Sequence, residues 1–139
     1  MSKEKLIQGL NDDLAAELGT VIRYTYQAAK CYGLQAAELR KLLREEAEDE
    51  LGHATYLMDV IQDLGVEPTT TPKSFDKPSD IKGMLELNIK MEAEDVVNYL
   101  AHAKLAEELD LPELKMKLEE MAADEDGHGR ALRRLLKGL

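Results

Sequence analysis

Apolar side chains recur every three or four residues along four long stretches of this chain, which is the spacing of one face of an α-helix. The pattern predicts four helices, over about residues 2–31, 34–64, 80–109 and from 112 onward. Gly33 and Gly65 stand where the first two helices should stop. Ser79 or Asp80 can cap the third helix, and Pro112 stands in a helix-start position.

The segment between the second and third predicted helices, residues 66–78, contains Pro68, Pro72 and Pro78 around three consecutive threonines. Because proline fixes φ and lacks an N–H group, we expect a loop here. If extended at ~3.3 Å per residue, this loop spans ~40 Å, which is the length of a helix bundle. The sequence therefore predicts an all-α four-helix bundle with one long crossover between the second and third helices.

One short pattern occurs twice in the chain. The sequence Asp-Glu-x-Gly-His-x-x-x-Leu stands at residues 49–57 and again, 75 positions later, at residues 124–132. The same offset relates Glu17 to Glu92, together with several apolar helix positions. At this length we expect a single domain, residues 1–139, made of two pseudo-repeats at about 1–65 and 79–139.

Six residues that normally face water lie within the predicted apolar stripes: Glu17, Glu50, His53, Glu92, Glu125 and His128. Burying unpaired carboxylates is unfavourable by several kcal/mol even after relaxation. None of the four stripes contains a lysine or arginine that could pair with them. Two divalent cations would balance the four negative charges, so the pattern predicts a two-metal centre inside the bundle.

The spacing within each repeat suggests how the ligands divide. A Glu-x-x-His pair puts both side chains on one helix face, where both can hold the same ion. Glu17 and Glu92 would complete the shell as terminal or bridging ligands. A site rich in carboxylates with two imidazoles favours iron or manganese over structural zinc, which prefers closed tetrahedral sets of Cys and His.

Several residues near the stripes have two interpretations. Tyr24 and Tyr99 follow Glu17 and Glu92 on the same faces and could be core residues or could act at the metal centre. Glu46 could lie beside the ligands or at a solvated edge, whereas the stripe places Glu94 outside the site.

Other positions give more definite expectations. Asp49 and Asp124 stand four residues before each histidine and could orient the imidazoles or form a route for cations. The repeated glycines Gly52 and Gly127 suggest close packing beside the ligands. His102 lies off the stripe, and we expect it to be exposed to solvent.

Composition excludes several classes of function. The formal net charge of −10 argues against binding of nucleic acid or anionic membrane surfaces through a basic patch. One cysteine, Cys31, permits no internal disulfide, which favours a reducing compartment. No apolar run is long enough to span a membrane, and the N-terminus lacks the apolar core of a signal peptide, so we expect a cytoplasmic protein.

At these residues the chain resembles the ferritin-like superfamily and, within it, the bacterioferritins and mini-ferritins. The resemblance spans all four helices and is carried by Ala16-Glu17-Leu18, Asp49-Glu50-x-x-His53, Glu92 and Asp124-Glu125-Asp126-Gly127-His128. It implies that Glu17, Glu50, His53, Glu92, Glu125 and His128 bind two iron ions per subunit, with manganese or zinc as substitutes. It also implies that Tyr24 is the tyrosine of that centre.

The implied activity is oxidation of two Fe(II) ions by O2 or H2O2 to a diferric species, with iron stored as mineral if the protein forms a hollow shell. The implied assembly is a homo-oligomer with a dimer as its building block. Bacterioferritins carry a haem-binding methionine where this chain has Leu51, so we expect no haem at that position. The short terminal helix that lines the channels of large ferritin cages does not occur before Leu139, so a dimer and a smaller mini-ferritin shell stay open beside a 24-subunit shell.

Two alternatives to iron storage remain open. Asp95 stands three residues after Glu92, where the rubrerythrin branch carries a second acid, and could be an extra ligand in peroxide reduction. Against this, Val96 matches the stripe better and no Cys-x-x-Cys module is present. The other alternative, from a different class, is a metal-free acidic bundle that acts as an adaptor.

Overall fold

The computed structural model describes residues 2–139, which form four long α-helices and, over that range, no β-strand. The helices are α1 (Ser2–Ala29), α2 (Gly33–Asp63), α3 (Ile81–Glu108) and α4 (Pro112–Lys137). The predicted helix limits agree with these bounds to within two residues. The prediction of an all-α four-helix bundle is therefore confirmed.

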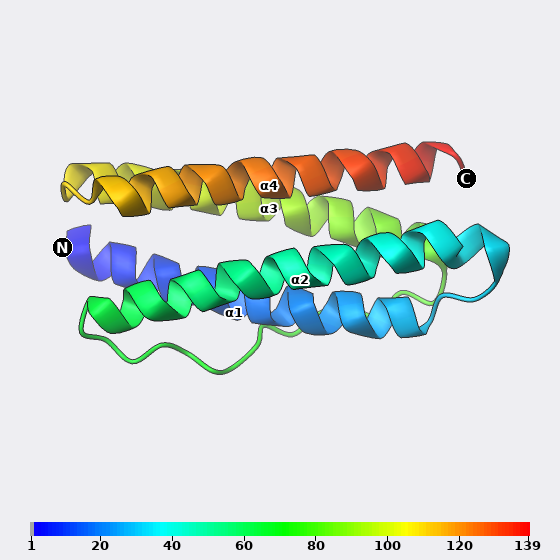
Figure 1. The fold of residues 1–139 in the computed structure, drawn as a ribbon, viewed down its shortest axis with the longest axis horizontal. Coiled ribbons are helices and arrows are strands. Elements are labelled where there is room, and N and C mark those ends of the chain that lie inside the picture. The colour runs from blue at the N-terminus through cyan, green and yellow to red at the C-terminus, as the bar shows by residue number, and fades with distance from the viewer. Residues whose placement is uncertain (1) are drawn as a thin grey trace.

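The helices pack as two hairpins joined by the long crossover. In Figure 1, α1 and α2 run in opposite directions, as do α3 and α4, and the crossover makes α2 and α3 run the same way. Contacts are densest within the hairpins, α1 with α2 and α3 with α4, sparser between α1 and α3, and sparser still between α2 and α4. The side of the bundle between α2 and α4 is therefore its most loosely packed side.

The end of α2 and the start of α3 have the glycine stop and the side-chain cap that the sequence predicts. Gly65 has a φ of 82° just after α2, and the N–H of Val66 donates to the carbonyl of Ile61 at 3.2 Å. These are the features of a helix stop with a left-handed residue. At the start of α3, the Asp80 carboxylate accepts a 2.8 Å hydrogen bond from the N–H of Gly83, which confirms Asp80 as the cap.

The crossover loop lies along α1 and is fixed to it at several points. The N–H of Thr69 donates to the Asn11 side chain, and the N–H of Lys73 donates to the carbonyl of Ala15, both at 2.9 Å. A Cβ atom on Gly19 would lie 2.5 Å from the carbonyl oxygen of Lys73, so only glycine lets the loop approach this closely.

The apolar core is divided into two clusters along the bundle. One cluster contains Leu10, Leu57, Leu118 and their neighbours, and the other contains Leu39, Leu43, Leu85, Leu132 and their neighbours. Between them lies a layer of buried polar side chains from all four helices. The two apolar clusters are therefore separated by polar side chains and do not form one continuous core.

Two further features bear on the sequence analysis. Cys31 is buried at the end of the second apolar cluster. Among residues 2–139, none of the helices combines the length and the apolar character needed to cross a lipid bilayer.

Candidate metal centre

The six predicted residues meet in the polar layer, although their positions in the sequence span more than a hundred residues. Each helix contributes at least one of them: α1 gives Glu17, α2 gives Glu50 and His53, α3 gives Glu92, and α4 gives Glu125 and His128. The four glutamates are at most 1% exposed, and the two histidines are 7% and 9% exposed. The carboxylates are thus withdrawn from water, as the stripes predict.

These residues form two groups that could each hold a metal ion. The first contains Glu17, Glu50, His53 and Glu125, and the second contains Glu50, Glu92, Glu125 and His128. Within each group the candidate ligand atoms all lie within 4.8 Å of one another. Glu50 and Glu125 belong to both groups, so a pair of metal ions would share them, whereas Glu17 belongs only to the first group and Glu92 only to the second.

The imidazole rings present the same nitrogen to the cluster. Nδ1 of His53 lies 3.2 Å from Oε2 of Glu17 and 3.2 Å from Oε1 of Glu125. Nδ1 of His128 lies 3.2 Å from Oε1 of Glu50 and 3.9 Å from Oε2 of Glu92. Metal–ligand bonds of about 2 Å put neighbouring ligand atoms roughly 3 Å apart, so these spacings suit donors around a common ion.

Many atoms of the cluster are buried without a hydrogen-bond partner. They are Glu17 Oε1, both carboxylate oxygens of Glu50 and of Glu125, Glu92 Oε2 and His128 Nδ1. A buried polar atom without a partner is unfavourable by roughly 1–3 kcal/mol. Because almost all of these atoms are acceptors, the partner that fits them is a cation, so the residues present fit the implied pair of metal ions.

The pKa values of the buried glutamates also show that their negative charges lack partners. Burial raises the pKa values of Glu17, Glu92 and Glu125 above the ordinary value of a glutamate. Burial opposes ionisation of Glu50 too, but the close polar groups of Glu17, His128 and Glu125 lower its pKa to about 2. Without a metal, Glu17, Glu92 and Glu125 therefore hold their protons to higher pH than an ordinary glutamate, and a bound cation would displace those protons.

The pKa of His128 is raised in this arrangement. Burial alone would lower it, but the close carboxylate of Glu50 and the nearby carboxylates of Glu46 and Glu92 raise it to about 10. A protonated His128 imidazole would supply part of the positive charge that a metal ion would otherwise bring to these carboxylates.

Each histidine is held from outside by an aspartate of the other hairpin. Nε2 of His53 lies 3.0 Å from Asp124 Oδ2, and Nε2 of His128 lies 3.2 Å from Asp49 Oδ2. A carboxylate on this nitrogen fixes the tautomer that leaves Nδ1 free to bind a metal. The Asp49 and Asp124 side chains are 62% and 48% exposed, so they also connect the cluster to solvent between α2 and α4.

The profile of the ferritin-like domain matches residues 7–139 of the sequence. The chain belongs to the ferritin-like family. A bacterioferritin of Brucella melitensis is 31% identical over 127 residues, which cover 89% of this chain and 78% of the relative.

Solved structures agree with this assignment. A ferritin-like, diiron-carboxylate protein from Bacillus anthracis is 39% identical, covers 98% of both chains and superposes with a TM-score of 0.95. The bacterioferritin of Desulfovibrio desulfuricans is 24% identical, covers 98% of this chain and 80% of its own, and has a TM-score of 0.88. At that lower identity the second structure supports the fold alone.

The two tyrosines of this ferritin-like chain differ although the repeat relates them. Both are buried, but only Tyr24 is engaged, since its hydroxyl donates to Oε1 of Glu92. The Tyr99 hydroxyl has no hydrogen-bond partner. Tyr24 thus bonds to the candidate ligand Glu92, whereas the Tyr99 hydroxyl only lies near the candidate ligand Glu17, where it acts to lower the pKa of that carboxyl, and its ring packs edge-on to His53.

A buried cation was missed in the sequence. Arg23 is 1% exposed, and its Nε donates to Oδ1 of Asn88 at 3.0 Å, beside Gln27. The expectation that no basic residue lies among the stripes was therefore incomplete, although Arg23 pairs with an amide and not with the glutamates. The available signal was a second, polar stripe on α1, in which Asp13, Thr20 and Gln27 recur every seven residues.

The expectation that His102 is exposed was wrong. Its side chain is 17% exposed, and its Nδ1 lies 2.5 Å from Oδ2 of the buried Asp13. Its ring also covers Gly9, where an added Cβ atom would collide with the imidazole. The absence of a side chain at Gly9 is what lets an imidazole lie between α1 and α3.

Three other acids near the stripes differ in how far they are buried. Glu46 is buried and not at a solvated edge, and its burial raises its pKa to about 8. Asp95, which is 9% exposed, is more buried than the neighbouring stripe residue Val96 but belongs to neither ligand group. Burial raises the pKa of Asp95 to about 8 as well. Glu94 is exposed, as expected.

The interpretation of the repeated glycines was wrong. A Cβ atom at Gly52 or Gly127 would meet nothing within 4 Å, because both residues are exposed on the outer faces of α2 and α4. They do not bring helices close together beside the ligands. The adjacent Leu51 is 53% exposed on α2.

Proposed function

We propose that this ferritin-like protein is a di-iron ferroxidase, which oxidises Fe(II) with O2 or H2O2 and stores or detoxifies the iron. Its ligands would be Glu17, Glu50, His53, Glu92, Glu125 and His128. The observation that carries the proposal is the pair of four-residue groups that share Glu50 and Glu125. The family match and the relative described as a diiron-carboxylate protein support iron as the metal.

When bound, the iron pair supplies the redox change: two Fe(II) ions lose one electron each, and O2 with two protons becomes H2O2, or H2O2 with two protons becomes water. The protein positions the donors for this change. Asp124 and Asp49 hold the Nε2 side of each imidazole, so that Nδ1 faces the cluster. Tyr24 holds Oε1 of Glu92 and leaves Oε2 free toward the second group.

The surroundings of the ligands favour the same reaction. The two apolar clusters flank the ligand layer and exclude water from it along the bundle axis. The open direction lies between α2 and α4, where the half-exposed carboxylates of Asp49 and Asp124 would attract Fe(II) from solution. Fe(II) is thus expected to arrive where the bundle is most loosely packed.

Stopped-flow mixing of anaerobic Fe(II)-loaded protein with oxygenated buffer tests the proposal. We expect rapid oxidation that saturates near two iron ions per chain, with Zn²⁺ as a redox-inert competitor. Glu50→Ala removes a ligand common to both groups and should abolish the rapid phase. Glu94→Ala removes an exposed acid of the same helix bundle and should leave it unchanged. Rapid oxidation that persists in Glu50→Ala would contradict the proposal.

A second candidate is a rubrerythrin-like peroxide reductase that does not store iron. Its support is Asp95, a buried acid three residues after Glu92 that neither ligand group uses. The two candidates differ in how much iron the assembly takes up. Loading well beyond two iron ions per chain in a hollow homo-oligomer favours storage. Loading that stops at two, with faster turnover by H2O2 than by O2 and loss of that preference in Asp95→Asn, favours the reductase.

A further inference from the structure

The two ends of the bundle differ in shape. At one end, where α1 connects to α2, Tyr32 and Leu34 are 80% and 96% exposed on either side of Gly33. Gly33 has a φ of 77°, which turns the chain outward between them. We call this pair of side chains the apolar knob. Two large apolar side chains almost fully in water at one turn are typical of an interaction site.

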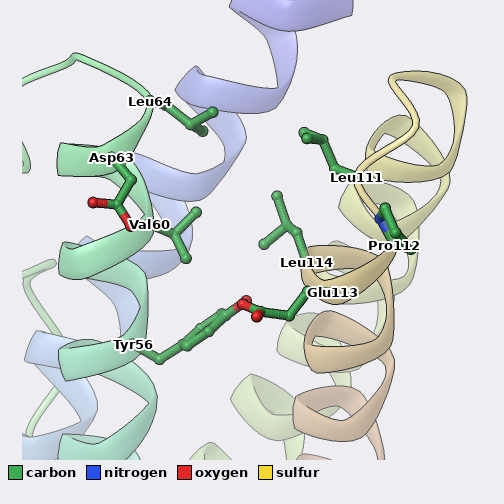
Figure 2. A pocket seen from close by; sticks show the side chains of 8 residues that line it. All are labelled: Tyr56, Val60, Asp63, Leu64, Leu111, Pro112, Glu113 and Leu114. Carbon is green, nitrogen blue, oxygen red and sulfur yellow. The ribbon is translucent and has the colours of Figure 1, made fainter.

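The opposite end carries an open apolar pocket of about 310 Å³. Figure 2 shows Val60 and Leu64 of α2 facing Leu111 and Leu114 across it, with Tyr56 reaching toward Glu113. A cavity of about 150 Å³ holds a benzene molecule. The pocket therefore has room for the two side chains of the knob.

The charges around the knob and the pocket have opposite signs. Residues 27–44, which surround the knob, contain Lys30, Arg40, Lys41 and Arg44 and one acid, Glu38. Acids predominate around the pocket: residues 59–67 and 107–113 contain Asp59, Asp63, Glu67, Glu107, Glu108, Asp110 and Glu113, against the two nearby lysines Lys115 and Lys117. Opposite potentials on two surfaces steer them together and fix their register.

We propose that the knob of one copy docks in the pocket of the next copy, end to end. Each copy presents both surfaces at opposite ends, so the contact is between unlike surfaces and repeats from copy to copy. Such a contact closes into a ring or shell when its rotation permits. The inference does not depend on the proposed iron chemistry, because assembly is measured on metal-free protein.

Thiol cross-linking tests the contact directly. In a Cys31→Ala background, one chain carries Leu34→Cys and a second carries Asp63→Cys at the exposed rim of the pocket. A short thiol-specific cross-linker should join the two chains, whereas Val97→Cys, an exposed apolar position in the middle of α3, should give no product with Asp63→Cys. A chain with both Leu34→Cys and Asp63→Cys should give a ladder of trimers and longer products. A failure to link Leu34→Cys with Asp63→Cys overturns the proposal.

The native mass of the wild-type protein gives a second test. We expect an assembly larger than a dimer that becomes smaller in Leu34→Asp and at high salt, while Val97→Asp keeps the wild-type mass. Leu34 is almost fully exposed, so its substitution should leave the helical circular dichroism of the chain unchanged. An unchanged mass in Leu34→Asp, or a monomeric wild-type protein at the concentrations used for cross-linking, would equally contradict the contact.

Discussion

Asp124 holds the imidazole of His53 on the facing helix, with its Oδ2 3.0 Å from Nε2, although His128 is the histidine nearest to it in sequence. Asp49 holds His128 in return. Each hairpin therefore orients the metal-binding side chain of the other hairpin. This exchange couples the two halves of the chain at the candidate metal centre.

Loss of this contact should weaken metal binding more than it weakens the fold. Removal of a carboxylate that orients a ligating histidine commonly lowers metal affinity by about 10–100-fold. We expect this loss for Asp124→Ala in Mn²⁺ titrations by calorimetry, with little change in the melting temperature of the metal-free protein. Asp126→Ala, an exposed acid two residues away, is the matched control and should bind like wild type. Equal affinities in the two variants would show that Asp124 does not orient His53.

The two tyrosines related by the repeat should respond differently to loss of the hydroxyl. Tyr24→Phe removes a hydrogen bond to the buried Glu92, and an ordinary intramolecular hydrogen bond contributes about 0.5–1.5 kcal/mol to stability. Tyr99→Phe removes a hydroxyl that lies near Glu17 without a full hydrogen bond and should therefore lower stability less. Urea unfolding of the metal-free variants measures both changes. A larger loss in Tyr99→Phe than in Tyr24→Phe would refute this assignment of roles.

The metal-free protein should lose stability as the pH rises from about 5 to 8. Folding raises the pKa of Asp95 from 3.8 to about 8 and that of Glu46 from 4.5 to about 8. Between those values the folded state holds protons that the unfolded chain has released, so each group lowers stability by up to about 1.4 kcal/mol per pH unit. His128, raised from 6.5 to about 10, acts in the same direction above pH 6.5.

Thermal melts of chelator-treated protein across this range measure the slope, and Asp95→Asn should make it shallower. The trend reverses at low pH, because the pKa of Glu50 is lowered to about 2 and its contribution is lost as the pH falls below 4.5. A stability that rises steadily from pH 5 to 8 would show that these acids are not buried in the folded chain.

Alanine should have opposite effects at two helical glycines. At Gly9 the new Cβ atom would collide with the His102 ring, and overpacking of this kind destabilises by about 1–3 kcal/mol. At Gly52 the new Cβ atom meets open space, and alanine in a helix interior is favoured over glycine by roughly 0.5–1 kcal/mol. Denaturant unfolding of Gly9→Ala, Gly52→Ala and the double variant Gly9→Ala with His102→Ala should show the first penalty disappear when the ring is removed.

The repeats made much of the fold and the candidate centre predictable. Apolar periodicity located the helices, and Glu17, Glu50, His53 and their repeat partners stood out because acids on an apolar stripe are unfavourable without a partner. The same reasoning failed for Arg23 and His102. Their partners Asn88 and Asp13 lie on another helix more than sixty residues away, and only the packing of α1 against α3 brings them together.

A pattern based on apolar residues also does not predict which polar side chains next to a stripe are buried. Asp95 and Val96 are adjacent, and apolar character favoured Val96, yet the rotation of α3 turns Asp95 further inward. Gly52 and Gly127 were misread for a related reason, because a repeated glycine shows where a side chain is missing and not what surrounds it.

The ligand layer that divides the apolar core has a consequence for how the protein opens. Helices ordinarily fray from their termini, but here the least favourable contacts of the metal-free chain lie at mid-length, between two well-packed ends. Amide hydrogen exchange should therefore begin near the middle turns of α2 and α4 and slow there by orders of magnitude once metal is added. Metal bound in this layer would therefore stabilise the bundle at its centre and not at its ends.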